Sequence, residues 1–316
     1  MVPPHDLVYL CSLFGACSKR TQGAGGNISV KQEGLLWIKA SGTRLSAVSK
    51  KSGFACCKLD TLHELFERGS ECLTSALAYP ESEPPSMETF FHLLPYSHIV
   101  HIHPTFFCKY LCSKQARTIF SAENFPNSSY IYYIKPGYPL ANAIFEYHSN
   151  ETVIFLENHG IILLGNSVDE IIQLFTDTTY KLEKVVDEKN LASPIAIEHQ
   201  LYQLTNEFAK PVYPGLTIPS YFDPITPDHF LFLKEAPLIT TKDTLEKDLL
   251  DCKSMPSVVR VDKHTYTLGK TVEQAQNKED YLQSYVEIWS DSTYLNQENT
   301  AELLSCSKEK LRMNKE

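Results

Sequence analysis

The sequence predicts an α/β protein that continues into a C-terminal extension. Helical and extended segments alternate over roughly the first 190 residues, with glycine and proline turns between them. Of the 316 residues 43% are hydrophobic, which is enough to build a sizeable core. Beyond about residue 200 the chain is richer in proline and charge, so we expect a first domain at 1–200 and an extension at 201–316.

The first domain shows both helical and strand periodicities. Helices are expected at residues 7–19, 60–68, 86–94, 105–115, 140–147 and 168–189. Strands are expected at residues 27–30, 35–40, 99–103, 130–134, 153–156 and 161–164. The first two strands are separated by the turn Gln32-Glu33-Gly34, which predicts a hairpin. The extension is expected to hold weaker strands and a final helix.

Charge and cysteine usage exclude several classes of function. The formal net charge is −9 and the isoelectric point is about 5.7, so no excess of cations is present to bind nucleic acid or an anionic membrane. No stretch reaches the ~20 consecutive apolar residues that span a bilayer. The nine cysteines lack the spacings of a disulfide framework, which indicates a reducing compartment and hence the cytoplasm.

Three histidines are candidates for metal ligands. His101 and His103 alternate along an expected strand, so their side chains share a face about 6–7 Å apart. His159 lies in an Asn-His-Gly turn, where we expect Gly160 to adopt a left-handed conformation that lets the ring project. The alternatives are packing or hydrogen bonding for the strand pair and simple solvent exposure for His159.

Glu88 completes this set with a carboxylate. It follows Ser86, a plausible N-cap of the helix expected at 86–94, so the favourable field of a helix N-terminus is an alternative explanation for its charge. Taken together, three imidazoles and one carboxylate are ligand types that zinc prefers, and a catalytic site keeps one position open. We therefore expect about one zinc, or another divalent metal, per chain.

Two loops and one serine are candidates for phosphate binding. The loop from Gly23 to Asn27 matches neither nucleotide-binding glycine motif, but its backbone amides can still face an anion. Ser41-Gly42 follows the second expected strand, and Ser86 begins an expected helix, so both can add hydroxyl and amide donors. The alternative for each is an ordinary turn or cap.

Six short motifs in one order give the sequence a resemblance to a known family. They are Gly25-Gly26-Asn27-Ile28-Ser29, Lys39-Ala40-Ser41-Gly42, Pro85-Ser86-Met87-Glu88, His101-Ile102-His103-Pro104, Lys135-Pro136-Gly137 and Asn158-His159-Gly160. Residues 7–190 resemble the class II aldolase/adducin family. Leu36–Gly42 and the ending Glu309-Lys310-Leu311-Arg312 look most like its longer subfamily, related to rhamnulose-1-phosphate aldolase domains.

The resemblance implies a fold, an assembly and a set of site residues. The fold would be an αβα sandwich around a mostly antiparallel sheet, and the chain would form a cyclic homo-oligomer, expected to be a tetramer. His101, His103 and His159 would hold the metal, and Glu88 would act as acid/base beside it. The expected phosphate-binding positions are Gly26, Asn27, Ser41, Gly42 and Ser86.

The implied activity is retro-aldol cleavage of a ketose phosphate to a ketone phosphate and an aldehyde. The tyrosine with which some members protonate the aldehyde is not assigned, because Tyr130, Tyr132 and Tyr133 all lie nearby. The same groups also suit a sugar-phosphate epimerase or a dehydratase. A further alternative is a non-catalytic, adducin-like interaction protein, although the presence of the full ligand set favours an enzyme.

Overall fold

The computed structural model describes residues 2–188, 202–204, 207–212, 218–233, 236–252, 254–262, 264–289, 292–306 and 309. The chain divides into two compact units, Met1–Leu191 and Ala192–Glu316. The boundary expected at residue 200, the last residue of the helix expected at 168–189 and the segment Lys310-Leu311-Arg312 all lie outside the described residues.

The first unit is built on a seven-stranded sheet in the order β3-β2-β1-β4-β7-β6-β5. All neighbouring pairs are antiparallel except β5 and β6, so the expectation of a mostly antiparallel sheet is confirmed. The strands are β1 (Asn27–Gln32), β2 (Leu35–Lys39), β3 (Phe54–Lys58), β4 (His98–Ile102), β5 (Ser128–Ile131), β6 (Val153–Leu156) and β7 (Gly160–Gly165).

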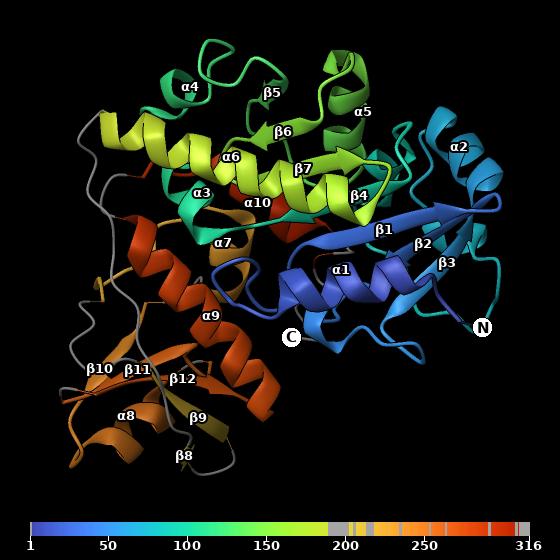
Figure 1. Ribbon diagram of the computed structural model, residues 1–316. Coiled ribbons are helices and arrows are strands. Elements are labelled where there is room, and N and C mark those ends of the chain that lie inside the picture. Colours follow the sequence, from blue (N-terminus) through green and yellow to red (C-terminus); the bar gives the residue numbers. More distant parts are fainter. Residues whose placement is uncertain are drawn as a thin grey trace. The chain divides into compact units, whose positions relative to one another are not determined.

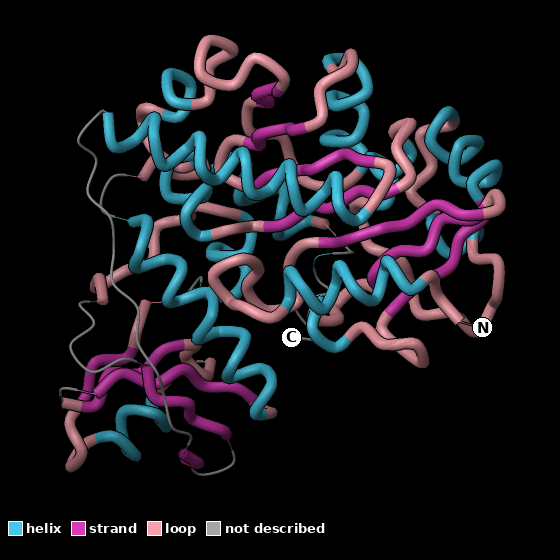
Figure 2. Tube along the Cα trace, viewed as in Figure 1, coloured by secondary structure: helices cyan, strands magenta, loops and turns pink. Residues whose placement is uncertain are grey.

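Helices cover both faces of this sheet, as Figures 1 and 2 show. The α-helices are α1 (His5–Gly15), α2 (Leu59–Glu67), α3 (Thr105–Leu111), α4 (Ala116–Ile119), α5 (Tyr138–Tyr147) and α6 (Val168–Glu188). Three 3₁₀ helices join them, η1 (Leu45–Ala47), η2 (Leu73–Ala76) and η3 (Thr89–Leu93). The αβα sandwich expected from the sequence is therefore confirmed.

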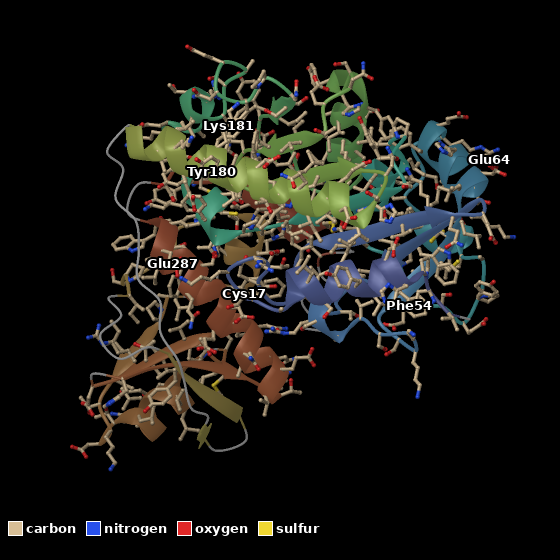
Figure 3. The ribbon with its side chains drawn as sticks, viewed as in Figure 1. Cys17, Phe54, Glu64, Tyr180, Lys181 and Glu287 are labelled. Atoms are coloured by element: carbon tan, nitrogen blue, oxygen red, sulfur yellow. The ribbon has the colours of Figure 1, made fainter. Side chains whose placement is uncertain are left out.

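Alternation along β1 and β4 divides the core between the two faces of the sheet. Ile28 and Val100 belong to a cluster that α1, α3 and α6 cover. Ile99 belongs to a second cluster, which α2, η3 and α5 cover. On the outer side of α6, Tyr180 is exposed to solvent (Figure 3). Asn27, Ser29 and His101 belong to the same alternating set as Ile99, so they share the face of the second cluster.

One expected element is wrong. The helix expected at 86–94 is reduced to the short 3₁₀ helix η3, and Ser86 is not its N-cap, because Glu88 occupies that position. Packing explains the difference. Phe90 and Phe91 are buried in the second cluster, and the buried ring of His92 is hydrogen-bonded to side chains of β1. These contacts with the sheet, and not local helix propensity, decide the conformation of the segment.

The second unit contains a five-stranded sheet in the order β10-β11-β12-β9-β8. Its strands are β8 (Tyr202–Leu204), β9 (Glu207–Val212), β10 (Leu238–Thr240), β11 (Val258–Val261) and β12 (His264–Gly269). Its helices are α7 (Pro227–Leu233), α8 (Leu245–Asp251), α9 (Val272–Ile288) and α10 (Gln297–Ser305). Thr271 caps α9 by accepting a hydrogen bond from the Gln274 amide at 3.1 Å.

Candidate metal centre

The His-Ile-His segment lies at the end of β4, in the middle of the sheet. His101 is in the strand and His103 follows it directly, so both rings leave the same face. Their Nε2 atoms are 3.0 Å apart, and both side chains are buried. The structure thus brings the two predicted ligand atoms together on one side of the sheet.

His159 joins them from the turn between β6 and β7. Its ring centroid is 4.8 Å from that of His101 and 5.0 Å from that of His103. The expectation that Gly160 is left-handed is wrong, because Asn158 carries the positive φ of 52° instead. Asn tolerates this conformation better than most residues, so the turn does not need glycine for it. Position 160 needs glycine for a different reason, because its backbone lies so close to Ile102 and His103 that a side chain would clash with them.

Glu88 lies at the start of η3 and faces the histidine side chains. Its Oε2 lies 3.5 Å from His101 Nε2, and its Oε1 lies 3.5 Å from His159 Nε2. The carboxylate is therefore directed at the imidazoles, and not along the axis of a helix. A helix field is a poor explanation for this residue, because η3 is one short 3₁₀ segment that offers little dipole.

One hydrogen bond fixes the ring of His101. Its Nδ1 lies 3.0 Å from the carbonyl oxygen of Ile161, and because a carbonyl only accepts, Nδ1 must carry the proton. A neutral imidazole protonated at Nδ1 has its lone pair at Nε2, which is the atom that faces His103 and Glu88. Backbone hydrogen bonds of this kind set the tautomer of histidines that bind metals.

These residues fit a divalent metal. One nitrogen from each of the three rings lies within 4.8 Å of the others. With Zn–N bonds of about 2.0–2.1 Å, two tetrahedral ligand nitrogens are ~3.3 Å apart, close to the 3.0 Å found here. Glu88 Oε1 is buried and accepts no hydrogen bond from the described residues, so a cation beside it would satisfy it. Three imidazoles and a carboxylate are also the ligands zinc prefers.

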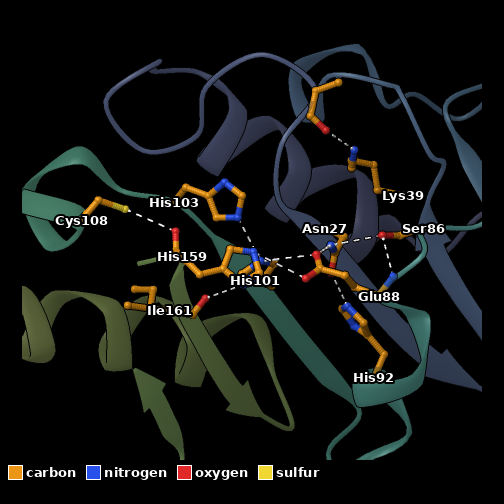
Figure 4. Close-up of polar contacts among 11 residues, drawn as sticks. Asn27, Lys39, Ser86, Glu88, His92, His101, His103, Cys108, His159 and Ile161 are labelled. Atoms are coloured by element: carbon orange, nitrogen blue, oxygen red, sulfur yellow. Dashed lines mark hydrogen bonds and ion pairs between the residues drawn. The ribbon is translucent and has the colours of Figure 1, made fainter. Parts of the chain in front are cut away.

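A polar network surrounds Glu88 on the side away from His101, His103 and His159 (Figure 4). Asn27 Nδ2 donates to Glu88 Oε2 at 2.8 Å and lies 3.2 Å from Ser86 Oγ. His92 Nε2 contacts Asn27 Oδ1, and His92 Nδ1 lies 2.7 Å from Ser29 Oγ. The sequence reasoning missed His92 and Ser29. The available signal was a polar residue, Ser29, between apolar neighbours in a strand.

The expected phosphate-binding positions are partly gathered by backbone contacts. An isolated antiparallel bridge pairs Ala40 with Pro85, and the Ser41 amide donates to the Pro84 carbonyl at 2.9 Å, which joins the Ser41-Gly42 segment to the segment that contains Ser86. Ser86 Oγ accepts hydrogen bonds from Asn27 Nδ2 and from the Glu88 amide, so its own proton can be donated to a ligand. Gly26 has a φ of 63°, and a Cβ there would lie 2.8 Å from the His101 carbonyl oxygen.

The candidate tyrosines lie around Glu157, next to the His159 turn. Tyr130 donates its hydroxyl proton to Glu157 at 3.0 Å, and burial together with the Glu157 charge raises the pKa of Tyr130. The Tyr133 amide donates to the other Glu157 oxygen at 3.0 Å. Arg117 stacks over the exposed Tyr132 ring, 4.1 Å from its centroid. These contacts hold the strand before the turn in place, but they do not identify a proton donor.

Fold and site together point to a known family of α/β proteins. The family model for the class II aldolase and adducin N-terminal domain matches residues 5–183. The chain belongs to the class II aldolase and adducin family. Among the described residues, none of the helices has the length and apolar character needed to cross a bilayer.

Comparisons with individual proteins are more distant. The chain is similar to the "Uncharacterized oxidoreductase YuxG" of Bacillus subtilis (strain 168), at 26% identity over 207 residues, which is 58% of this chain and 30% of that protein. The chain thus spans about a third of that relative. A class II aldolase domain from Thermoplasma acidophilum has 24% identity and a TM-score of 0.52, covering 57% and 92% of the two chains. An L-fuculose 1-phosphate aldolase has 17% identity and a TM-score of 0.45, covering 62% and 92%.

Proposed function

We propose that this chain is a zinc-dependent aldehyde lyase, which cleaves a ketose phosphate into a ketone phosphate and an aldehyde. The observation that carries this assignment is the convergence of His101, His103 and His159 on the carboxylate of Glu88, whose Oε1 accepts no hydrogen bond from the described residues. Membership of the class II aldolase family supports the same reaction class.

The protein's own groups supply binding and proton transfer. Bound zinc would supply Lewis-acid stabilisation of the negative charge that C–C cleavage leaves on the ketone fragment. The neutral imidazoles add no charge of their own, so the cation keeps its full charge. Glu88 Oε1 exchanges a proton with the substrate, because it faces the histidines and accepts no hydrogen bond from the described residues.

The phosphate of the substrate is assigned to Ser41, Gly42 and Ser86, which belong to the two segments that the Ala40–Pro85 bridge joins. A fixed phosphate positions the reacting bond and lowers the entropic cost of reaction. Asn27 is different, because both N–H groups of its side-chain amide already face Ser86 and Glu88. We therefore assign Asn27 to holding Glu88 and Gly26 to shaping the loop beside His101. We also propose that the protein acts in the cytoplasm as a homo-oligomer, expected to be a tetramer.

The test is metal analysis of the purified protein followed by a screen of ketose phosphates for aldehyde release. About one zinc per chain is expected, with equal amounts of aldehyde and ketone phosphate formed. The matched unphosphorylated ketose should react poorly, because it lacks the group that Ser41, Gly42 and Ser86 bind. Isomerised sugar without aldehyde would indicate an epimerase, loss of water a dehydratase, and neither metal nor turnover an adducin-like interaction protein.

A further inference from the structure

A hydrogen-bonded chain of four buried side chains ends on the Glu88 carboxylate. It runs from Ser29 to His92, from His92 to Asn27 and from Asn27 to Glu88. Ser29 and His92 are fully buried, and Asn27 and Glu88 are nearly so. Figure 4 shows the part from His92 through Asn27 to Glu88. The chain links β1 to both ends of the Glu88–His92 segment, which lies about 60 residues further along the sequence.

The direction of every bond in this chain follows from the carboxylate. An ionised carboxylate only accepts, so Asn27 must turn its NH₂ group toward Glu88 Oε2. The Asn27 carbonyl then faces His92, which requires a proton on His92 Nε2. A neutral His92 carries only that one proton, so its Nδ1 accepts from the hydroxyl of Ser29.

His92 stays neutral in the folded protein. Burial, with smaller electrostatic contributions from His101 and Lys31, holds the pKa of His92 well below its usual 6.5. The ring therefore presents one donor and one acceptor at neutral pH, as the chain of bonds requires. His92 does not contact the three histidines of the metal centre through any hydrogen bond among the described residues; its ring nitrogens are engaged by Ser29 and Asn27.

The consequence of this chain is that the two oxygens of Glu88 differ. Oε2 is tied to Asn27 at 2.8 Å, whereas Oε1 accepts no hydrogen bond from the described residues and lies 3.5 Å from His159 Nε2. If the Asn27 amide turned over, its carbonyl would face Oε2 and repel it. On the side of Asn27 away from Glu88, the proton on His92 Nε2 favours the orientation in which the Asn27 carbonyl faces His92.

We propose that His92 is a positioning residue, which acts through Asn27 to hold the Glu88 carboxylate with Oε2 engaged and Oε1 directed at the metal centre. The functional value of that orientation rests on the role proposed above for Glu88. The hydrogen-bond chain itself can be tested without any substrate. Removing a residue that orients a group at a metal site typically changes metal affinity or activity by about 10–100-fold.

The test compares His92→Phe with His92→Gln. Phenylalanine keeps a ring of similar size but removes both hydrogen bonds, whereas glutamine can donate to Asn27 and accept from Ser29. The matched control is His98→Phe, the same replacement of a buried histidine on the opposite face of the sheet, where His98 contacts Asp6 at 3.1 Å. Zinc affinity is measured by competition with a chelator, and turnover is measured on whichever ketose phosphate the screen identifies.

His92→Phe should bind zinc about 10–100-fold more weakly, with kcat lowered and KM little changed, while His92→Gln recovers most of both and His98→Phe matches the wild type. Unchanged zinc affinity in His92→Phe, equal losses in both His92 variants, or an equal loss in His98→Phe would each overturn the proposal. If the variants show this pattern of zinc affinity but the wild type cleaves no ketose phosphate, the proposed reaction is wrong and the positioning role of His92 still holds.

A second measurement covers the case in which His92→Phe fails to fold. Long-range ¹⁵N–¹H spectra of the full-length protein labelled at histidine report which ring nitrogen carries the proton, and His92→Gln assigns the His92 signals. A neutral His92 protonated at Nε2 is expected with and without zinc. Protonation at Nδ1, or at both nitrogens at neutral pH, would contradict the hydrogen-bond directions on which the positioning role depends.

Discussion

Gly160 lies so close to Ile102 that a Cβ on it would be 2.5 Å from the Ile102 carbonyl oxygen and 2.7 Å from His103 Cδ2. This contact joins the first residue of β7 to the end of β4, where the His-Ile-His segment lies. Two of the three histidines depend on it, because His159 precedes Gly160 and His103 follows Ile102. The glycine therefore sets the distance between the two segments that bring the imidazoles together.

Gly160→Ala should separate these segments and weaken metal binding. The added methyl group meets backbone, which cannot move aside as a flexible side chain would, and overpacking of this kind typically costs about 1–3 kcal/mol of stability. The measurement is zinc affinity together with urea unfolding. Gly34→Ala is the control, because Gly34 also has a special backbone conformation, with φ of 73°, but nothing lies within 4 Å of its Cβ position. It should lose stability without losing zinc affinity.

Most strands were predictable because each is a short apolar run between turn residues. Val153–Leu156 and Gly160–Gly165 are of this kind, and Asn158 lies in the turn between them. The strand Phe54–Lys58 was missed, because its Cys-Cys centre has little strand character by itself. Segment 86–94 was mistaken for a helix, since its conformation is decided by packing against distant strands and not by local propensity.

The ligand set could be named from short motifs, but its supporting residues could not. His101 and His103 share a strand face because they are two residues apart, and this spacing can be read directly from the sequence. Ser29 and His92, by contrast, are 63 residues apart and meet only because η3 packs over β1. Long-range hydrogen bonds of this type have no periodicity, so the sequence offers no pattern that would reveal them.

Stability should fall as pH decreases below about 6.5, in part because of His92. Its pKa is well below 6.5 in the folded protein, so in that range the unfolded chain binds a proton that the folded chain does not. Unfolding is then favoured by up to about 1.4 kcal/mol for each pH unit from this one group. Urea unfolding of metal-free protein at several pH values should show a shallower pH dependence in His92→Gln than in the wild type. Equal slopes would mean that His92 is protonated in the folded state.

The metal centre should belong entirely to the first unit. Met1–Leu191 forms a compact unit and contains all four proposed metal-site residues, whereas the described part of Ala192–Glu316 holds no group of three His, Cys, Asp or Glu ligands. A fragment of residues 1–191 should therefore bind about one zinc, and residues 200–316 expressed alone should neither bind zinc stoichiometrically nor turn over a ketose phosphate. Turnover by residues 200–316 alone would show that the second unit contains a catalytic centre of its own.

Glu88→Gln should separate proton transfer from metal binding. Glutamine keeps the size of the side chain and can still accept from Asn27, but it cannot exchange a proton, so turnover should fall by roughly 10²–10⁴-fold. Much of the zinc should remain on the three histidines. His103→Ala is the companion variant, because loss of an imidazole should lower zinc content as well as turnover.

Glu83→Gln provides the matched control for this charge change. Its carboxylate lies five residues earlier and accepts a hydrogen bond from the Gly53 amide at 2.7 Å, a contact that glutamine can also make. Turnover and zinc content are measured for all three variants at saturating zinc on the ketose phosphate from the screen. Glu83→Gln should match the wild type in both. If Glu88→Gln also retained near wild-type turnover, Glu88 would not be the acid/base, and its contacts with Asn27 and the histidines would serve only to hold the metal centre together.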